Sequence, residues 1–240
     1  MAPGRRLCLS LFALLLTLTV GAIPARADAI GPGFDLFATT SGTTVCLTGI
    51  GCIQMVGKPI GPFNTDTIVQ RMSGISPFNV GDTGTIPIEL VALSLQSVQP
   101  VQMGSNFFNV TVTLTPNTVS SGQMTVNHNG ANGGTFDSFF DVFFDITLTD
   151  IQNPQNTQTQ SISDRITGSG TWSHTPPPNY PFDPRFPSGG FYPGALSEGG
   201  TNFSLVHNVT PAQTPEPGTL TLFGAGLAGV AMRLRRKLRG

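Results

Sequence analysis

Three aspartates spaced four residues apart are the most regular set of chemically active side chains in this sequence. Asp137, Asp141 and Asp145 alternate with phenylalanines, and on an extended strand all of these side chains fall on one face. Carboxylates can hold a cation, and aromatic rings can stack on sugar rings. The pattern therefore predicts either a ligand surface for a cation or a sugar, or a solvated or intersheet face without a ligand. The spacing does not match a calcium-binding loop.

The segment 171–187 is a second candidate surface, because it combines aromatic residues with many prolines. It contains Tyr180 and Trp172, which is the single tryptophan of the chain. Prolines favour polyproline geometry, and a stiff aromatic loop loses little conformational entropy when it binds a polysaccharide or protein partner. The alternative is a long loop that covers an open end of the fold, with its aromatic side chains packed on the core.

Two cysteines lie close together in the chain, Cys46 and Cys52, with Gly49 and Gly51 between them to form a tight turn. In an exported protein, two cysteines that close so short a loop predict a structural disulfide. A metal site would need more thiolates or a nearby histidine cluster, and therefore no metal site is expected.

Motifs for catalysis are missing from the sequence. His128, His174 and His207 are far apart, and neither a paired-histidine metal spacing nor a Gly-x-Ser-x-Gly nucleophile motif occurs. A phosphate-binding loop and a dinucleotide fingerprint are also missing. The sequence therefore predicts a protein that is not an enzyme and needs no cofactor. A triad can still assemble in space from scattered residues, which leaves a hydrolase as a third hypothesis.

The elements that must position these side chains are strands. Residues 108–115 alternate apolar and polar side chains, and residues 139–149 repeat this pattern. Further strands are expected at residues 66–71, 86–98, 123–127, 164–171 and 202–207. No helical period is visible between them. The expected fold class is all-β, with an antiparallel β-sandwich or barrel-like core. An N-terminal signal helix and a short C-terminal apolar helix should flank this core.

The N-terminal region has the three parts of an export signal. Arg5 and Arg6 precede an apolar run, and Pro24 ends this run. Ala25 and Ala27 then supply the small residues that signal peptidase reads, which predicts a signal peptide at residues 1–27 and a mature chain from Asp28. A retained N-terminal anchor is the alternative, for which the apolar run is short.

The C-terminal region also has three parts, namely the triplet Pro215, Glu216 and Pro217, an apolar segment Thr219–Met232, and a basic cluster. The basic cluster consists of Arg233, Arg235, Arg236, Lys237 and Arg239. The apolar segment has 14 residues, fewer than the roughly 20 that a bilayer core requires of a helix. Because it is short, it suits a transient stop-transfer segment better than a permanent anchor. The basic cluster supports the stop-transfer role, because cations resist crossing a membrane. The alternative is a plain C-terminal membrane tail in which the Pro-Glu-Pro triplet occurs by accident.

This tail resembles the PEP-CTERM sorting signal of bacterial exported proteins. The resemblance implies recognition and processing by an exosortase-type membrane enzyme at the Pro-Glu-Pro triplet. It also implies passage through the cell envelope, as an inner-membrane intermediate, to the outer surface or beyond the cell. The expected domains are the signal peptide, an extracytoplasmic β-rich domain at residues 28–210 and a sorting tail at residues 211–240. Signal peptidase and the exosortase are the expected processing partners.

Removing both terminal regions leaves an acidic domain. Residues 28–214 contain four basic and twelve acidic residues, a formal charge of −8. Such a charge argues against nucleic acid and anionic polysaccharide as partners. It suits divalent cations or neutral sugars, and it also keeps an exported protein soluble.

Three hypotheses for the domain follow. The first is a structural or surface component of the cell envelope or extracellular polysaccharide matrix. The second is a carbohydrate- or cation-binding module that uses the Trp172 and Tyr180 loop or the aspartate strip. The third is a hydrolase with a spatially assembled site.

Overall fold

Alternating apolar and polar residues produce long strands in this chain. The computed structural model describes residues 29–214, which contain thirteen strands and no helix. The strands are β1 (Gly33–Thr39), β2 (Thr44–Leu47), β3 (Gly51–Gly57), β4 (Thr67–Arg71), β5 (Thr83–Ser97), β6 (Val101–Met103), β7 (Asn106–Leu114), β8 (Ser120–Gly130), β9 (Gly133–Asp150), β10 (Thr157–Ser173), β11 (Tyr192–Pro193), β12 (Leu196–Gly200) and β13 (Leu205–Pro211). No helix that could span a membrane is present in this described part.

Eight of the strands close into an antiparallel barrel, in the order β1, β4, β5, β8, β9, β10, β12, β13 and back to β1. The pairing of Phe37 with Pro211 and of Thr39 with Val209 joins the first strand to the last. This closure confirms the predicted all-β antiparallel fold and selects the barrel over the sandwich. The two expected terminal helices lie outside the described residues.

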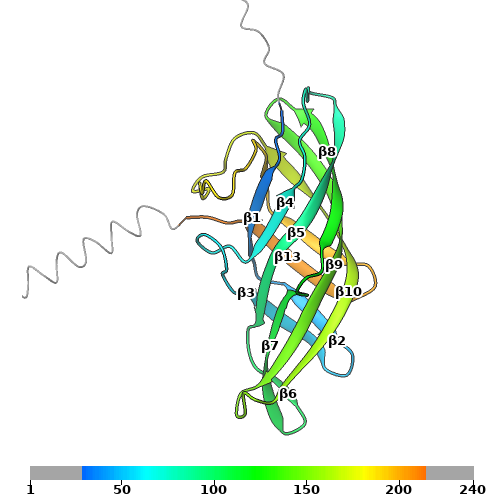
Figure 1. The fold of residues 1–240 in the computed structure, drawn as a ribbon, viewed down its shortest axis with the longest axis vertical. Coiled ribbons are helices and arrows are strands. Elements are labelled where there is room, and N and C mark those ends of the chain that lie inside the picture. The colour runs from blue at the N-terminus through cyan, green and yellow to red at the C-terminus, as the bar shows by residue number, and fades with distance from the viewer. Residues whose placement is uncertain (1–28, 215–240) are drawn as a thin grey trace, which may run out of the picture.

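The barrel is elongated because three positions in the strand order are each filled by two short strands, one in each half of the barrel. β8 lies between β5 and β9 in one half of the barrel, and β7 takes this place in the other half. Likewise β3 follows β4 along the edge of β5, and β2 follows β1 along the edge of β13. The long strands β5, β9 and β10 run through much of the cylinder (Figure 1).

The interior of the barrel is filled by the apolar face that the alternation predicts. On β9 the side chains of Phe140, Phe144 and Ile146 are buried inside, whereas their neighbours Asp141 and Asp145 point outward and are half-buried. β7 follows the same rule. Because side chains alternate along a strand, a shift of one residue would turn the whole apolar set outward, and so this pattern holds the register.

A second, smaller apolar cluster lies on the outside of β1 and β4. Leu36, Ile68 and Ala212 are buried together there, with Phe34 and Phe186 packed against them. The chain beyond β13 covers this side, since the Ala212 amide donates to the Leu36 carbonyl at 2.8 Å. β1 is therefore buried on both faces, unlike the strands of the opposite wall.

The segment 174–191 between β10 and β11 packs beside the start of β1, where the Gly31 amide donates to the Gly189 carbonyl and the Phe34 amide donates to the Pro187 carbonyl. Arg71 holds this segment from inside, because its guanidinium donates to the Ser188 carbonyl and lies 4.7 Å from the centre of the Phe191 ring. Arg71 also donates to Asp35 at 3.0 Å, and both side chains are buried. Burial raises the pKa of Asp35 to about 6, and the positive charge of Arg71 opposes this rise.

Candidate functional site

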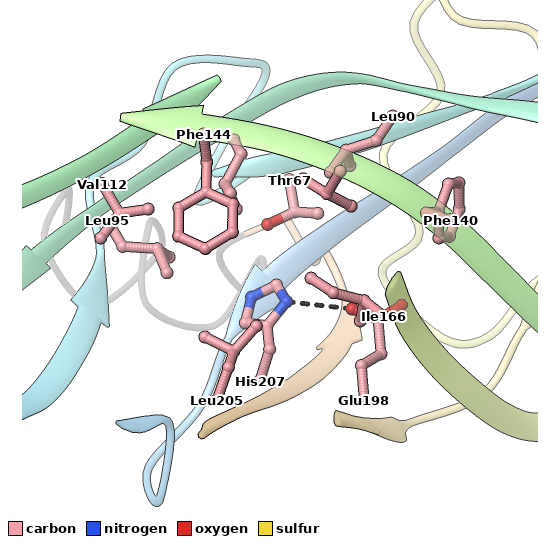
Figure 2. Close-up of a pocket in the computed structure, with 12 residues that line it drawn as sticks. Thr67, Leu90, Leu95, Val112, Phe140, Phe144, Ile166, Glu198, Leu205 and His207 are labelled. Carbon is pink, nitrogen blue, oxygen red and sulfur yellow. Dashed lines mark hydrogen bonds and ion pairs between the residues drawn. The ribbon is translucent and has the colours of Figure 1, made fainter. Parts of the chain in front are cut away.

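Inside the barrel, a hydroxyl contacts an imidazole and the imidazole contacts a carboxylate. This is the spatial order of the groups in a nucleophilic triad. The His207 Nε2 is 3.1 Å from the Thr39 Oγ1, and the His207 Nδ1 is 3.0 Å from the Glu198 Oε2. Figure 2 shows the His207 ring directed at Glu198 among apolar side chains. Sequence reasoning did not connect these residues, because they come from β1, β12 and β13.

The surroundings of this chain of groups do not favour attack on a substrate. The Thr39 hydroxyl donates to Asp66 at 2.7 Å, so its proton does not point at His207. The adjoining cavity has a volume of about 20 Å³ and is lined mainly by apolar side chains such as Phe144 and Leu205. That volume holds about one water molecule. The residues therefore form a buried hydrogen-bond network that connects β1, β12 and β13 to the start of β4.

The outer wall formed by β8, β9, β10 and β12 contains a larger hollow. It has a volume of about 470 Å³ and lies between two rows of side chains that the strand register places opposite one another. One row is Thr125, Asp137, Ser169 and Ser197, and the other is Gln123, Phe139, Thr167 and Gly199. We call this site the outer hollow. Hydroxyl, amide and carboxylate groups surround one aromatic ring in it.

A surface ion pair borders the outer hollow. The Arg165 Nε and Nη2 donate to the two carboxylate oxygens of Asp141, each at 2.8 Å. The Arg165 guanidinium also lies 4.4 Å from the centre of the Phe139 ring. The hydrogen bonds from Arg165 are the main cause that lowers the pKa of Asp141 below its usual value. The pair therefore holds Phe139 in place at the edge of the hollow.

The three aspartates of β9 lie on the outer face, as the strand pattern predicts, but they do not form a cation site. Four residues along a strand span about 13 Å, too far for one ion to bridge. Asp141 is bound to Arg165, and Asp145 accepts a hydrogen bond from Thr115 at 2.7 Å. Within residues 29–214 no group of three or more His, Cys, Asp or Glu side chains could hold a metal ion. The arrangement of these aspartates therefore favours the alternative of a solvated outer face.

Trp172 and Tyr180 are buried, with 4% and 5% of their surface exposed. Trp172 stacks on Phe191 at 5.2 Å between ring centres, and its Nε1 donates to the Asn127 carbonyl at 3.2 Å. Tyr180 packs edge-on against Tyr192. Burial raises the pKa of its hydroxyl, and the nearby Asp35 carboxylate adds to this effect. Of the two alternatives for this segment, the burial of Trp172 and Tyr180 therefore favours the one in which the aromatic side chains pack on the core.

Cys46 and Cys52 are joined by a disulfide across the β2–β3 hairpin, which confirms that prediction. The remaining predicted site residues lie outside the described residues. They are Ala25 and Ala27 of the signal peptide, Pro215, Glu216 and Pro217 of the triplet, and Arg233, Arg235, Arg236, Lys237 and Arg239 of the basic cluster.

Comparison with protein-family models finds a match in the tail. The PEP-CTERM protein-sorting motif matches residues 213–237. No curated protein matches the chain, and no solved structure matches it. The motif implies processing by an exosortase. The chain is therefore an exported protein that carries the PEP-CTERM sorting motif of exosortase substrates and is sorted to the cell envelope or surface.

Proposed function

We propose that this protein is a component of the cell envelope or extracellular matrix, and that its barrel binds neutral polysaccharide at the outer hollow. The observation that carries this proposal is the hollow itself, where hydroxyl and amide groups surround Phe139 on a rigid wall of four paired strands. Within the proposal the barrel is a binding scaffold and not a catalyst. A signal peptidase removes residues 1–27, and an exosortase processes the tail at the Pro-Glu-Pro triplet.

The chemistry of the outer hollow supports a sugar ligand. Sugar hydroxyls need partners that both donate and accept hydrogen bonds, and Thr125, Ser169 and Ser197 supply such hydroxyls. An aromatic ring adds an apolar surface for the C–H face of a sugar. The domain has a formal charge of −8 over residues 28–214, which repels anionic polymers and leaves neutral ones.

The shape of the outer hollow suits a polymer better than an enclosed small molecule. The hollow is open and lies on the side of the barrel, so a chain can cross it without threading into a cavity. A contact of this kind is weak for each sugar unit, and a matrix polymer compensates by offering many units to many protein copies.

Replacing Phe139 with alanine should weaken binding to a soluble neutral glucan by roughly 2- to 12-fold, because an aromatic contact is worth about 0.5–1.5 kcal/mol. Affinity gel electrophoresis in glucan-containing gels measures this as a loss of retardation. Phe143→Ala is the matched control, since Phe143 lies on the same outer face of β9 but does not line the outer hollow.

An equal loss in the Phe139→Ala and Phe143→Ala variants would contradict a specific role for the outer hollow. An anionic polygalacturonate should not retard the wild-type protein. If the wild-type protein binds no neutral polymer, the polysaccharide proposal fails, and a structural role without a sugar ligand is left.

Intact mass spectrometry of protein from its native host should show a chain that starts near Asp28 and ends near Pro215-Glu216-Pro217. Its mass should be two hydrogens below that of the reduced chain, because Cys46 and Cys52 form a disulfide. Additional mass would indicate a glycan or an anchor attached during processing. A full-length C-terminus found only in membranes would contradict processing and indicate an ordinary tail-anchored envelope protein.

A further inference from the structure

Hydrogen bonds hold the chain against the barrel from the end of β13 to Thr214. After β13 ends at Pro211, the Gln213 amide donates to the Asn64 Oδ1 at 3.2 Å, and the Thr214 amide donates to the Asn179 carbonyl at 2.8 Å. Asn64 belongs to the loop 58–66, and Asn179 belongs to the segment 174–191. The chain therefore leaves the barrel between these two loops (Figure 1). We call them the exit loops.

The exit loops expose large apolar side chains that the rest of the barrel does not cover. Phe182 is 73% exposed, Phe63 is 47% exposed and Ile60 is 50% exposed. Three of the twelve exposed large apolar side chains in residues 29–214 lie on these loops, and they include two of the three exposed phenylalanines. The third, Phe107, lies on β7 beside β6, at the far end of the cylinder (Figure 1). Exposed apolar side chains gathered at one place indicate an interaction surface.

Two of the four basic side chains of this acidic domain lie on the exit loops, which also carry the carboxylates of Asp183 and the buried Asp66. Of its four basic side chains, Arg71 is buried and Arg165 is bound to Asp141 on the opposite wall. The other two, Lys58 and Arg185, are exposed on the exit loops. Arg185 is held by Asp183 at 2.7 Å, and its own side chain is still 74% exposed. Cations beside aromatic and aliphatic side chains are typical of surfaces that contact anionic lipid headgroups.

The spacing between Thr214 and the apolar segment of the tail limits how far the barrel can be from a membrane. Four residues separate Thr214 from Thr219, and five backbone steps reach at most about 18 Å when fully extended. The headgroup layer on each side of a bilayer takes up roughly 6 Å of this distance. With Thr219–Met232 in the hydrocarbon core, the exit loops therefore come close to the headgroups.

We infer that the exit loops dock the barrel onto an anionic lipid surface while the tail is held in the membrane. This inference rests on the insertion of the tail, which is part of the proposed function. The apolar side chains of Phe63 and Phe182 enter the headgroup region, and Lys58 and Arg185 lie at its negatively charged surface. The docked barrel presents the Pro-Glu-Pro triplet at the membrane surface, where a membrane enzyme can reach it.

The test uses the full chain reconstituted in vesicles of phosphatidylethanolamine and phosphatidylglycerol, with and without brominated acyl chains that quench tryptophan. Phe182→Trp and Phe107→Trp are compared, because both positions are exposed phenylalanines and only one is on an exit loop. The buried Trp172 contributes the same background fluorescence in both variants. The tryptophan introduced at position 182 should lose emission and shift to shorter wavelength, whereas the one introduced at position 107 should show neither effect beyond the wild-type background.

Flotation of the same samples separates failure of the docking from failure of the tail insertion. Full chains that float with the vesicles while the two introduced tryptophans behave alike would overturn the docking and leave the tail insertion standing. Chains that do not float would overturn both. Quenching at position 182 should require the anionic lipid, because Lys58 and Arg185 contact its headgroups. Equal quenching in vesicles made only of neutral lipid would overturn docking onto an anionic surface.

Discussion

Replacing Arg71 with methionine should lower the free energy of unfolding by about 3–5 kcal/mol at pH 7, because one partner of a buried ion pair is removed. The Arg71 side chain has no exposed surface, and its Nη1 lies 3.0 Å from the Asp35 Oδ1. Without Arg71 the Asp35 carboxylate would stay buried with no cation beside it. Urea unfolding curves of the two proteins measure the difference.

This loss of stability should depend on pH. Burial raises the pKa of Asp35 from 3.8 to about 6, and Arg71 limits this rise. Because the folded pKa lies above the unfolded one, the stability that this group contributes is fully present below about pH 4 and is lost as the pH rises through the folded pKa. In the wild-type protein this loss of stability is complete slightly above pH 6. In Arg71→Met the folded pKa of Asp35 should be higher, because the positive charge that lowers it is gone. The loss of stability in the variant therefore continues to higher pH. The difference between the two proteins should therefore grow between pH 5 and pH 8.

The part of the deficit that remains at pH 4 reports the other contacts of Arg71, with the Ser188 carbonyl and the Phe191 ring. Arg165→Met is the matched control, since it removes an ion pair that is half exposed. Its effect should be much smaller because water screens the pair. A deficit of Arg71→Met that is the same at pH 4 and pH 8 would contradict an uncompensated Asp35 carboxylate as its cause.

Replacing Trp172 with alanine should also cost about 3–5 kcal/mol, because a large buried ring is deleted from a packed core. Trp172 stacks between Phe191 and Phe78, with ring centres 5.2 and 6.0 Å away. Its removal would leave a cavity under the segment 174–191. Denaturant unfolding followed by near-UV circular dichroism measures the loss of stability and of aromatic packing.

Trp172→Phe separates packing from ligand binding. This variant keeps an aromatic ring and loses the hydrogen bond to Asn127, which is worth about 1 kcal/mol, together with part of the ring volume. It should fold and bind a neutral glucan like the wild-type protein, because Trp172 lies inside the barrel and the outer hollow lies outside. A folded Trp172→Phe protein that no longer binds glucan would contradict this assignment.

The strands that could be predicted are those with one face in the core and the other in water. β7 and β9 show this alternation clearly, whereas β1 is buried on both faces because the chain beyond β13 and the segment 174–191 cover its outer side. β1 therefore has no polar face to recognise. β12 contains Gly199 and Gly200 within five residues, and for this reason it reads as a loop.

The candidate site could be predicted only in part, because it depends on register. The outward direction of Asp137 and Phe139 follows from alternation within β9, but their neighbours come from β8, β10 and β12, and the sequence does not show which strands pair. Alternation along β10 also decides between the two alternatives given for Trp172. Continuing the alternation of β10 from Ile166 places Trp172 on the inward face, although its proline-rich surroundings suggested exposure.

The pairing of β1 with β13 makes completion of the barrel depend on almost the whole length of the domain. Such distant pairing must overcome a large loss of chain entropy, and no shorter part of the chain can complete the ring. A chain exported from its N-terminus presents β1 early and β13 late. The barrel therefore cannot close before Pro211 is available to pair with Phe37. The sorting motif begins at residue 213, so the strand that closes the barrel and the motif that directs sorting are immediate neighbours in the chain.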